Sequence, residues 1–387
     1  MRTYLKTHPW LTFQLDLRLI VFKTWISLGE AQSKCEHISG VPLRPGVAEQ
    51  LHKVYLAKGV LATTAIEGNT LTEAEVLDHL EGKLKLPPSR EYLAREIDNI
   101  ITACDRITRD ILIHDKAETT VEKIKDYNKM VLNGLSLGDS IVPGELRTYS
   151  VGVGGYRAAP AEDCEFLLQK LCTWLNEFPA SENDRIVFGI IKAIIAHIYF
   201  VWIHPFGDGN GRTARLIEFQ MLLEAGVPTP AAHLLSNFYN QTRSEYYRQL
   251  DKTTKMKGNI SDFITYAING FVDQLKEQLD IIRRQQWDIV WRNYVHEMFK
   301  DQTSETAQRQ RRLALDLSLS TDASVRLAKI PEISTRMAAT YAKKTRKTLV
   351  RDVNTLIGMG LLEKTKEGIR AKREVILAFL PARKFTS

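Results

Sequence analysis

The chain has 387 residues, a length that suits two or three domains better than one small domain. Its hydrophobic share of 44% and charged share of 26% exclude a disordered or fibrous protein and are ordinary for a folded one. A formal net charge of +7 permits an anionic partner, but scattered surface lysine explains it equally well. Charge alone therefore assigns no partner.

The cysteines form no CxxC pair and mostly lie among residues with helical spacing: Cys35, Cys104, Cys164 and Cys172. Reduced, buried thiols are therefore expected, and they favour the cytoplasm. Asp16 and Arg18 interrupt the only apolar run near the N-terminus, so we predict no signal peptide. We also expect no apolar run long enough to span a membrane and no membrane partner.

Apolar residues recur with a helical period through most of the chain. The predicted helices cover residues 47–66, 71–80, 90–113, 120–135, 161–176, 185–203, 213–224, 244–254 and 260–286. Alternation at 13–17 indicates a short strand before them. Gly68 is expected to end the helix over 47–66, and Thr70 with Glu73 to form a capping box that begins the next helix.

A β-hairpin is predicted within residues 149–156, where alternating residues lead into Gly154 and Gly155. Farther along, residues 286–310 are helical, increasingly polar and rich in Gln and Arg, which is typical of a connector. Two short helices at 334–339 and 345–358 are expected beyond it. Strands at 363–370 and 374–379 would then form a two-stranded wing.

Residues 204–215, His-Pro-Phe-Gly-Asp-Gly-Asn-Gly-Arg-Thr-Ala-Arg, lie between two apolar helices. Gly209, Asn210 and Gly211 fall at the start of the second helix, where unpaired backbone N–H groups and the helix dipole attract an anion. Arg212 and Arg215 are three residues apart, so they share one helix face and can meet a phosphate chain together.

Two further side chains complete this loop. Asp208, beside a polyphosphate, is a natural ligand for Mg²⁺, which uses few carboxylates and keeps its waters. His204 has a near-neutral pKa in its ordinary state, which suits a base that takes a proton from a hydroxyl. The set indicates phosphoryl or nucleotidyl transfer. It is neither a P-loop nor a Rossmann fingerprint, and HExxH is absent.

The loop resembles the signature of the Fic (filamentation induced by cAMP) family, HxFx[D/E]GNGRxxR, at every specified position. The resemblance extends over about residues 100–280. It implies a mainly α fold, a Fic-type helical bundle with one β-hairpin flap, which would cover about residues 148–160. It also implies a protein adenylyltransferase, an enzyme that transfers AMP from ATP to a hydroxyl group of a protein.

Roles follow from the resemblance by position. His204 would be the general base that deprotonates a Ser, Thr or Tyr of the target, Phe206 a core anchor, and Asp208 the ligand of Mg²⁺. The residues expected to bind the nucleotide are Gly209, Asn210, Gly211, Arg212, Arg215 and, near adenine, Tyr247. The flap residues expected to hold an extended target segment by strand addition are Val151, Gly152, Val153 and Gly154.

A second stretch, Thr63-x-x-x-Glu67-Gly68, resembles the inhibitory helix motif [S/T]xxxE[G/N] of the same family. The resemblance implies that Glu67 pairs with Arg215 and blocks the productive position of the γ-phosphate. The physics agrees, because one carboxylate can occupy the arginine fork that a phosphate needs.

The C-terminal region resembles a winged helix-turn-helix. In the helix at 345–358 the apolar positions Leu349, Val353, Leu356 and Ile357 make a core face. The opposite face and the preceding turn carry Lys343, Lys344, Arg346, Lys347 and Arg351. Such a helix can enter a DNA major groove, but a protein-interaction module with a solvated basic face fits equally well.

The expected organisation is an N-terminal helical region with the inhibitory motif (1–100), a Fic core (101–285), a connector (286–310) and a winged-helix-like domain (311–387). The expected activity is self-inhibited AMP transfer to a protein, including this chain itself. Two alternatives stay open: a hydrolase that removes AMP with the help of Glu67, and a DNA-binding regulator with a nucleotide-sensing core. The protein target, the preferred donor nucleotide and a homodimer are left open.

Overall fold

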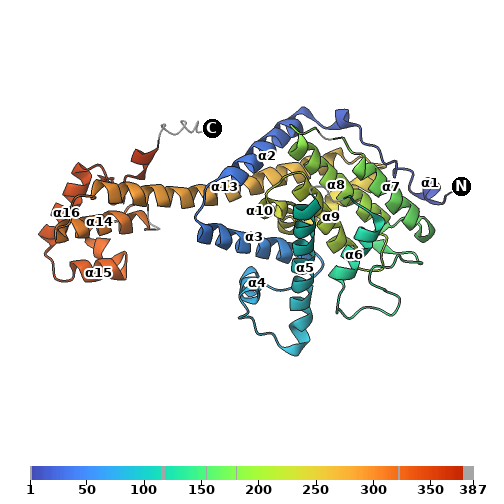
Figure 1. The fold of residues 1–387 in the computed structure, drawn as a ribbon, viewed down its shortest axis with the longest axis horizontal. Coiled ribbons are helices and arrows are strands. Elements are labelled where there is room, and N and C mark those ends of the chain that lie inside the picture. The colour runs from blue at the N-terminus through green and yellow to red at the C-terminus, as the bar shows by residue number, and fades with distance from the viewer. Residues whose placement is uncertain (1, 115–117, 154, 180, 321–322, 378–387) are drawn as a thin grey trace. The chain divides into compact units, whose positions relative to one another are not determined.

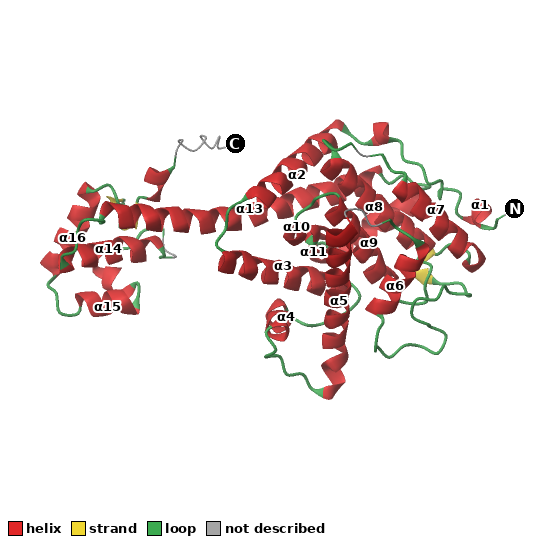
Figure 2. Cartoon of the chain, in the orientation of Figure 1, coloured by secondary structure: helices red, strands yellow, loops and turns green. Residues whose placement is uncertain are grey.

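The computed structural model describes residues 2–114, 118–153, 155–179, 181–320 and 323–377. The chain divides into two compact units, Met1–Leu279 and Asp280–Ser387 (Figure 1). Helices dominate both units, and the strands that are described form two small antiparallel hairpins (Figure 2). The predicted fold class, mainly α with a β-hairpin flap, is confirmed.

The first unit is a bundle of helices with one hairpin. Its helices are α1 (Tyr4–Thr7), α2 (Phe22–Gly40), α3 (Pro45–Ala65), α4 (Glu73–Leu80), α5 (Glu91–His114), α6 (Val121–Val131), α7 (Cys164–Asn176), α8 (Arg185–Ile203), α9 (Asn210–Glu224), α10 (Thr229–Ala232), α11 (Leu234–Gln241), α12 (Arg243–Lys255) and the first part of α13 (Ser261–Met298). The hairpin consists of β1 (Gly152–Val153) and β2 (Tyr156–Arg157).

Helix α8 is the centre of this unit and packs against α2, α7 and α9. Its mean hydropathy of 2.2 makes it long and apolar enough to cross a membrane by composition. The expectation that no such segment exists was therefore wrong. Because 78% of that apolar window is buried inside the protein, a core helix accounts for the same composition.

The described thiols agree with the expectation of reduced cysteine. Cys35, Cys104, Cys164 and Cys172 are all buried and free. Burial raises the pKa of each thiol, to about 12 for Cys35 and Cys172. These thiols are packing groups of the helical core.

Two local predictions near the N-terminus were wrong. Residues 13–17 form no strand, because Phe13 has a positive φ of 53° and its ring packs on Trp174 and Tyr199. The capping box is Thr72 with Glu75, two residues later than predicted. The buried Leu71 extends the approach to α4, so the helix begins after it.

Two other helix ends are informative for the site. Gly68, with a φ of 108°, follows α3 and donates its N–H to the carbonyl of Ala65, as expected for the end of that helix. Helix α9 begins at Asn210, three residues before its predicted start, because Gly209 adopts the left-handed conformation at the N-cap position. Asn210 and Gly211 therefore already belong to the first turn of α9, and Gly209 caps it.

The second unit contains the rest of α13, then α14 (Glu305–Ser318), α15 (Thr335–Tyr341), α16 (Arg346–Gly358), β3 (Leu362–Lys364) and β4 (Ile369–Ala371). Residues 286–310, predicted to be a connector, contribute Trp291, Val295 and Phe299 to the core of this unit. Asp352 is fully buried and accepts hydrogen bonds from Arg309 and Tyr341, which joins α14, α15 and α16.

The second strand of the predicted wing was placed too late. Strand β4 covers Ile369–Ala371 and pairs with β3, whereas Arg373–Ile376 form a short 3₁₀ helix. The register buries Leu362, Ile369 and Ala371 on one face, and this burial decides which residues pair. Residues 378 and 379 of the predicted strand lie outside the described residues.

Candidate active site

The loop between α8 and α9 has fixed ends. His204 ends α8 with a φ of 48° and donates its backbone N–H to the carbonyl of Phe200. Gly209, with a φ of 74°, precedes α9. Between them Phe206 is only 1% exposed and forms an isolated β-bridge with Leu146. The predicted core anchor is thus buried, and the loop cannot drift away from the bundle.

The Asn210 side chain closes the loop on itself. It donates from Nδ2 to the carbonyl of Phe206 at 2.8 Å and accepts the Phe206 N–H at 3.0 Å. Asn128 on α6 supports the same loop, because it donates to the carbonyl of Asp208 at 2.9 Å. The side chain of Asn210 is therefore engaged within the loop, and its backbone N–H at the helix start is what an anion would meet.

Arg147 joins the flap to the loop. It is 4% exposed and donates to the carbonyls of His204 and Tyr149, both at 2.7 Å, and to that of Ala159. Tyr149 and Ala159 stand on the two arms of the hairpin, so one guanidinium holds both arms and the base residue together. Sequence reasoning missed Arg147 and Asn128, whose only local signal is a polar residue beside a turn.

The imidazole of His204 is held in its neutral form. Burial, together with the nearby charge of Arg147, lowers its pKa to about 4, against smaller opposing effects of the Val201 backbone, Glu67 and Asp208. At neutral pH the ring therefore has a free lone pair and can accept a proton. Its neutral state is the one that a general base needs.

Arg215 contacts the predicted inhibitory motif, Thr63 to Gly68. Its Nη2 donates to Glu67 Oε1 at 2.6 Å and to the carbonyl of Thr63 at 2.9 Å. The contact of Thr63 is thus made by its backbone. Arg215 is 2% exposed, yet its Nε and Nη1 have no hydrogen-bond partner among the described residues. A buried guanidinium with two unpaired nitrogens has free N–H groups that an anionic ligand would satisfy.

The Glu67 carboxylate lies against the first turn of α9. A Cβ atom added to Gly211 would overlap Glu67 Oε1, so the carboxylate touches the backbone where an anion would bind. Desolvation raises the pKa of Glu67, but the charge and hydrogen bond of Arg215 outweigh it and hold the pKa below its ordinary value. Glu67 is therefore an ionised carboxylate at the start of the helix.

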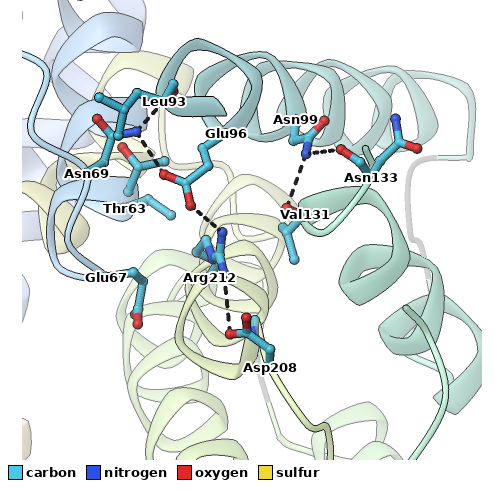
Figure 3. Close-up of polar contacts among 12 residues, drawn as sticks. Thr63, Glu67, Asn69, Leu93, Glu96, Asn99, Val131, Asn133, Asp208 and Arg212 are labelled. Carbon is cyan, nitrogen blue, oxygen red and sulfur yellow. Dashed lines mark hydrogen bonds and ion pairs between the residues drawn. The ribbon is translucent and has the colours of Figure 1, made fainter. Parts of the chain in front are cut away.

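Arg212 contacts a different acid (Figure 3). Its Nη1 donates to Glu96 Oε1 at 2.9 Å, and its Nη2 lies 3.4 Å from Asp208 Oδ1. The Asp208 side chain is 46% exposed, so this carboxylate faces solvent at the edge of the loop. Glu96, on α5, did not figure among the predicted site residues.

A cavity of about 460 Å³ opens beside these groups. His204, Gly211, Arg215 and Glu67 form its polar end. Its apolar walls come from the flap, α8, the end of α3 and α12: Ile66, Val153, Tyr156, Val201, Trp202, Tyr246, Tyr247 and Leu250. The cavity thus combines an anion-binding end with a wall that suits a flat apolar group.

Tyr247 and the flap residues Val153 and Tyr156 line this cavity. The Tyr247 ring is 42% exposed and its hydroxyl donates to the carbonyl of Ile66 at 3.3 Å. In the flap Val153 pairs with Tyr156, and the carbonyl of Val151 accepts the N–H of Ala158. Gly152 is exposed, and Gly154 lies outside the described residues.

Asp208 is the one predicted metal ligand. Among the described residues no cluster of three or more His, Cys, Asp or Glu side chains could hold a metal ion. A single exposed carboxylate nevertheless fits Mg²⁺, because that ion is commonly held by one or two carboxylates together with substrate phosphates and water. The donor set is therefore compatible with a metal that arrives with a nucleotide.

Comparison with known proteins agrees with this geometry. Residues 118–222 match the model of the Fic/DOC family. The chain is 30% identical over 239 residues to "Protein adenylyltransferase Fic" of Drosophila ananassae, which covers 62% of this chain and 45% of that protein. It is 30% identical over 230 residues to "Protein adenylyltransferase fic-1" of Caenorhabditis elegans, which covers 58% and 42%. The match spans less than half the length of these relatives.

Solved structures show the same fold. A Fic family protein from Desulfovibrio desulfuricans G20 aligns with a TM-score of 0.56 at 18% identity, over 94% of this chain and 95% of that one. Fic-1 from Caenorhabditis elegans aligns with a TM-score of 0.54 at 24% identity, over 67% and 73%. The loop, the helices around it and these likenesses agree: residues 118–222 match the Fic/DOC family, and the fold is that of solved Fic structures.

Proposed function

We propose that this protein transfers AMP from ATP to a hydroxyl group of a protein and that Glu67 restrains the reaction. The observation that carries the proposal is the state of Arg215. It is buried at a cavity shared with the neutral base His204, two of its three nitrogens have no hydrogen-bond partner among the described residues, and the third is held by Glu67 and the Thr63 carbonyl. The names of the curated relatives support the same activity.

The chemistry requires few groups. The phosphate chain of ATP binds at the start of α9 and to the guanidinium groups of Arg212 and Arg215, and adenine occupies the apolar end of the cavity beside Tyr247. The target oxygen attacks the α-phosphorus, its proton passes to His204, and the bond to the bridging oxygen breaks so that pyrophosphate leaves. The arginines and the helix start stabilise the charge that develops on the phosphates.

Asp208 would hold Mg²⁺ in this scheme. The ion supplies positive charge that offsets the charge of the phosphate oxygens. The protein's own part is to keep the Asp208 carboxylate exposed at the edge of the loop, beside Arg212. The exposed edge of β1 receives an extended segment of the target by strand addition, which carries the hydroxyl towards His204.

Self-inhibition follows from competition for the same donors. With Glu67 on Arg215 and against Gly211, the terminal phosphate meets a carboxylate of like charge where it needs a cation. ATP can then bind only displaced from the productive position or after Glu67 moves away. The restraint is therefore an equilibrium between two occupants of one arginine.

The proposal is tested by intact-mass spectrometry of the Glu67→Gly protein incubated with ATP and Mg²⁺. We expect a mass gain of one AMP group on this chain, together with release of pyrophosphate. Parallel incubations with GTP, UTP and CDP-choline identify the donor. A protein that gains no nucleotide from any donor, alone or with cell lysate as a source of targets, would refute the proposed transferase.

The expected pH dependence of the Glu67→Gly enzyme follows from the low pKa of His204. Burial keeps this base unprotonated as pH falls through 6.5, the ordinary value for histidine, and it gains a proton only towards pH 4. We therefore expect kcat/KM of the Glu67→Gly variant to show no loss centred near 6.5 that is due to the base. A profile that falls with an apparent pKa near 6.5, with saturating Mg²⁺ and a fixed ionic strength, would contradict this.

The second unit supports a second proposal, that it contacts DNA. In α16 the buried side chains Leu349, Val353 and Leu356 face the core, so the opposite face is left to solvent. The exposed side chains on that face and the preceding turn are basic: Lys343, Lys344, Arg346, Lys347 and Arg351. A shallow groove on the same face adds Asn354 and Thr355, which can bond to bases or phosphates.

DNA contact is tested on the full chain with a labelled duplex. Replacing Arg346, Lys347 and Arg351 together by glutamate is expected to weaken binding at least about 10-fold and to lower the salt slope by roughly 0.9 for each lost phosphate contact. The exposed lysines Lys23 and Lys53 of the first unit, also changed to glutamate, are the control. Binding that is insensitive to salt and to the triple change would leave α16 without a role in DNA contact.

A further inference from the structure

Glu96 of α5 contacts both the loop over residues 204–215 and the chain that follows the inhibitory motif. Its Oε1 accepts from Arg212 at 2.9 Å, and its Oε2 accepts from Asn69 Nδ2 at 2.9 Å (Figure 3). Its side chain is only 15% exposed, so both carboxylate oxygens are engaged in a place with little water. One carboxylate thus links the catalytic loop to the residue that follows the inhibitory motif.

Asn69 uses its whole amide to hold the chain after Glu67. Besides Glu96, Nδ2 donates to the carbonyl of Leu93 at 3.0 Å, and Oδ1 accepts the N–H of Leu71 at 3.0 Å. Its own N–H donates to the carbonyl of Thr64. Because Asn69 is 6% exposed, these bonds have little competition from water, and they fasten the turn after α3 to α5.

Helix α5 is itself held against the bundle one turn farther along. Asn99, three residues after Glu96, donates from Nδ2 to the carbonyls of Val131 and Asn133 at 3.2 and 2.8 Å. Residues three apart share a helix face, and Figure 3 shows both side chains pointing from α5 towards their partners. Glu96 is therefore a fixed acceptor, and Arg212 takes its position from it.

We propose that Glu96 positions Arg212 and that Asn69 attaches the turn after the inhibitory motif to the same carboxylate. The turn then reaches both arginines of the loop, Arg215 directly through Glu67 and Arg212 through Asn69 and Glu96. Arg212 also approaches Asp208, the residue expected to hold Mg²⁺. The positions of both side chains therefore depend on the link from Asn69 through Glu96 to Arg212, which we call the relay. The inference rests on the proposed AMP transfer and names a further part of its regulation.

Asn69 and Glu96 should behave differently when changed. Without Asn69 the turn loses its attachment to α5, so Glu67 is held less firmly over Gly211 and the restraint weakens. Glu96→Gln keeps the shape but has one acceptor oxygen where two donors, from Arg212 and Asn69, require two. One donor is left unpaired, and the position of Arg212 is no longer enforced.

The test measures incorporation of AMP from labelled ATP by the full chain. Asn69→Ala is expected to raise self-labelling about 10-fold over the wild type, whereas Asn69→Ala added to Glu67→Gly should give little further rise, because Glu67→Gly has already removed the restraint. The neighbouring exposed Thr70→Ala is the matched control. Self-labelling of Asn69→Ala equal to that of the wild type and of Thr70→Ala would overturn this half of the proposal.

Glu96→Gln is made in the Glu67→Gly background. We expect kcat/KM for ATP to fall about 10-fold, mainly through a rise in KM, because Arg212 binds the phosphates in the ground state as well as stabilising the charge that develops on them. Asp105→Asn, an exposed acid on the same helix, is the control. A fall in kcat with unchanged KM would signify loss of folded enzyme and overturn the positioning role, as would kinetics equal to those of the control.

The Glu67→Gly protein distinguishes failure of the proposed transferase from failure of the link through Asn69 and Glu96. If Glu67→Gly itself incorporates no nucleotide, the proposed transferase fails. If it is active while Asn69→Ala and Glu96→Gln behave as their controls do, the transferase stands and the relay is refuted.

Discussion

Replacing Glu67 by glycine is expected to raise self-AMPylation by roughly 10- to 100-fold, which corresponds to a coupling free energy of about 1–3 kcal/mol between the restraint and productive nucleotide binding. The substitution removes the carboxylate that holds Arg215 Nη2 and touches the backbone of Gly211. Both groups then become available to the terminal phosphate. The initial rate of label transfer from ATP, measured beside the wild type, gives the ratio.

Two companion variants separate charge from shape. Glu67→Gln removes the charge but keeps a carbonyl oxygen that can accept from Arg215, so an intermediate increase is expected. Glu49→Gln, on the exposed side of α3, should leave the rate unchanged. If Glu67→Gly gains no label but fails to remove AMP from a modified protein that the wild type does clear, Glu67 serves hydrolysis rather than restraint.

Removing the base should abolish the reaction. In the Glu67→Gly background His204→Ala is expected to lower the rate of AMP transfer by about 10²- to 10⁴-fold, the range over which a positioned proton acceptor contributes. ATP affinity should change little, because the donors on α9 and the apolar wall of the cavity remain. Single-turnover transfer and equilibrium binding of a labelled ATP analogue measure the two effects separately.

His204 also has a structural constraint, which a second variant controls. Its φ of 48° lies in the left-handed region, where asparagine is accepted more readily than alanine. His204→Asn therefore keeps the backbone while removing the base, and it should be as inactive as His204→Ala. His37→Ala, an exposed histidine on α2, is expected to be fully active. Transfer at the parental rate in both His204 variants would exclude it as the base.

Local sequence patterns predicted most of the long helices of the fold. The helical period over 47–66 and 185–203 matches α3 and α8 closely, because one buried face at a 3.6-residue spacing is a property of the segment itself. The capping box, the short strand at 13–17 and the second wing strand were misplaced. In each, a distant contact decided the outcome: burial of Leu71, packing of Phe13 on Trp174, and burial of Ile369.

Residues 204–215 are informative by themselves because their chemistry is contiguous. Glycines at a helix start, arginines one turn apart and a histidine before the loop specify an anion site wherever the loop lies. The pairing of Glu67 with Arg215 joins residues 148 positions apart, and only the family resemblance predicted it. No period or spacing in the chain indicates such a contact.

The sequence by itself therefore indicated an anion-binding loop and predicted the helical architecture. The tertiary structure alone decided which acid faces which arginine. Glu96 meets Arg212 across 116 positions, and Arg147 reaches His204 across 57. The physical reason is that the strength of a buried charge pair depends on distance and on exclusion of water, and both arise only when α3, α5 and α9 pack together.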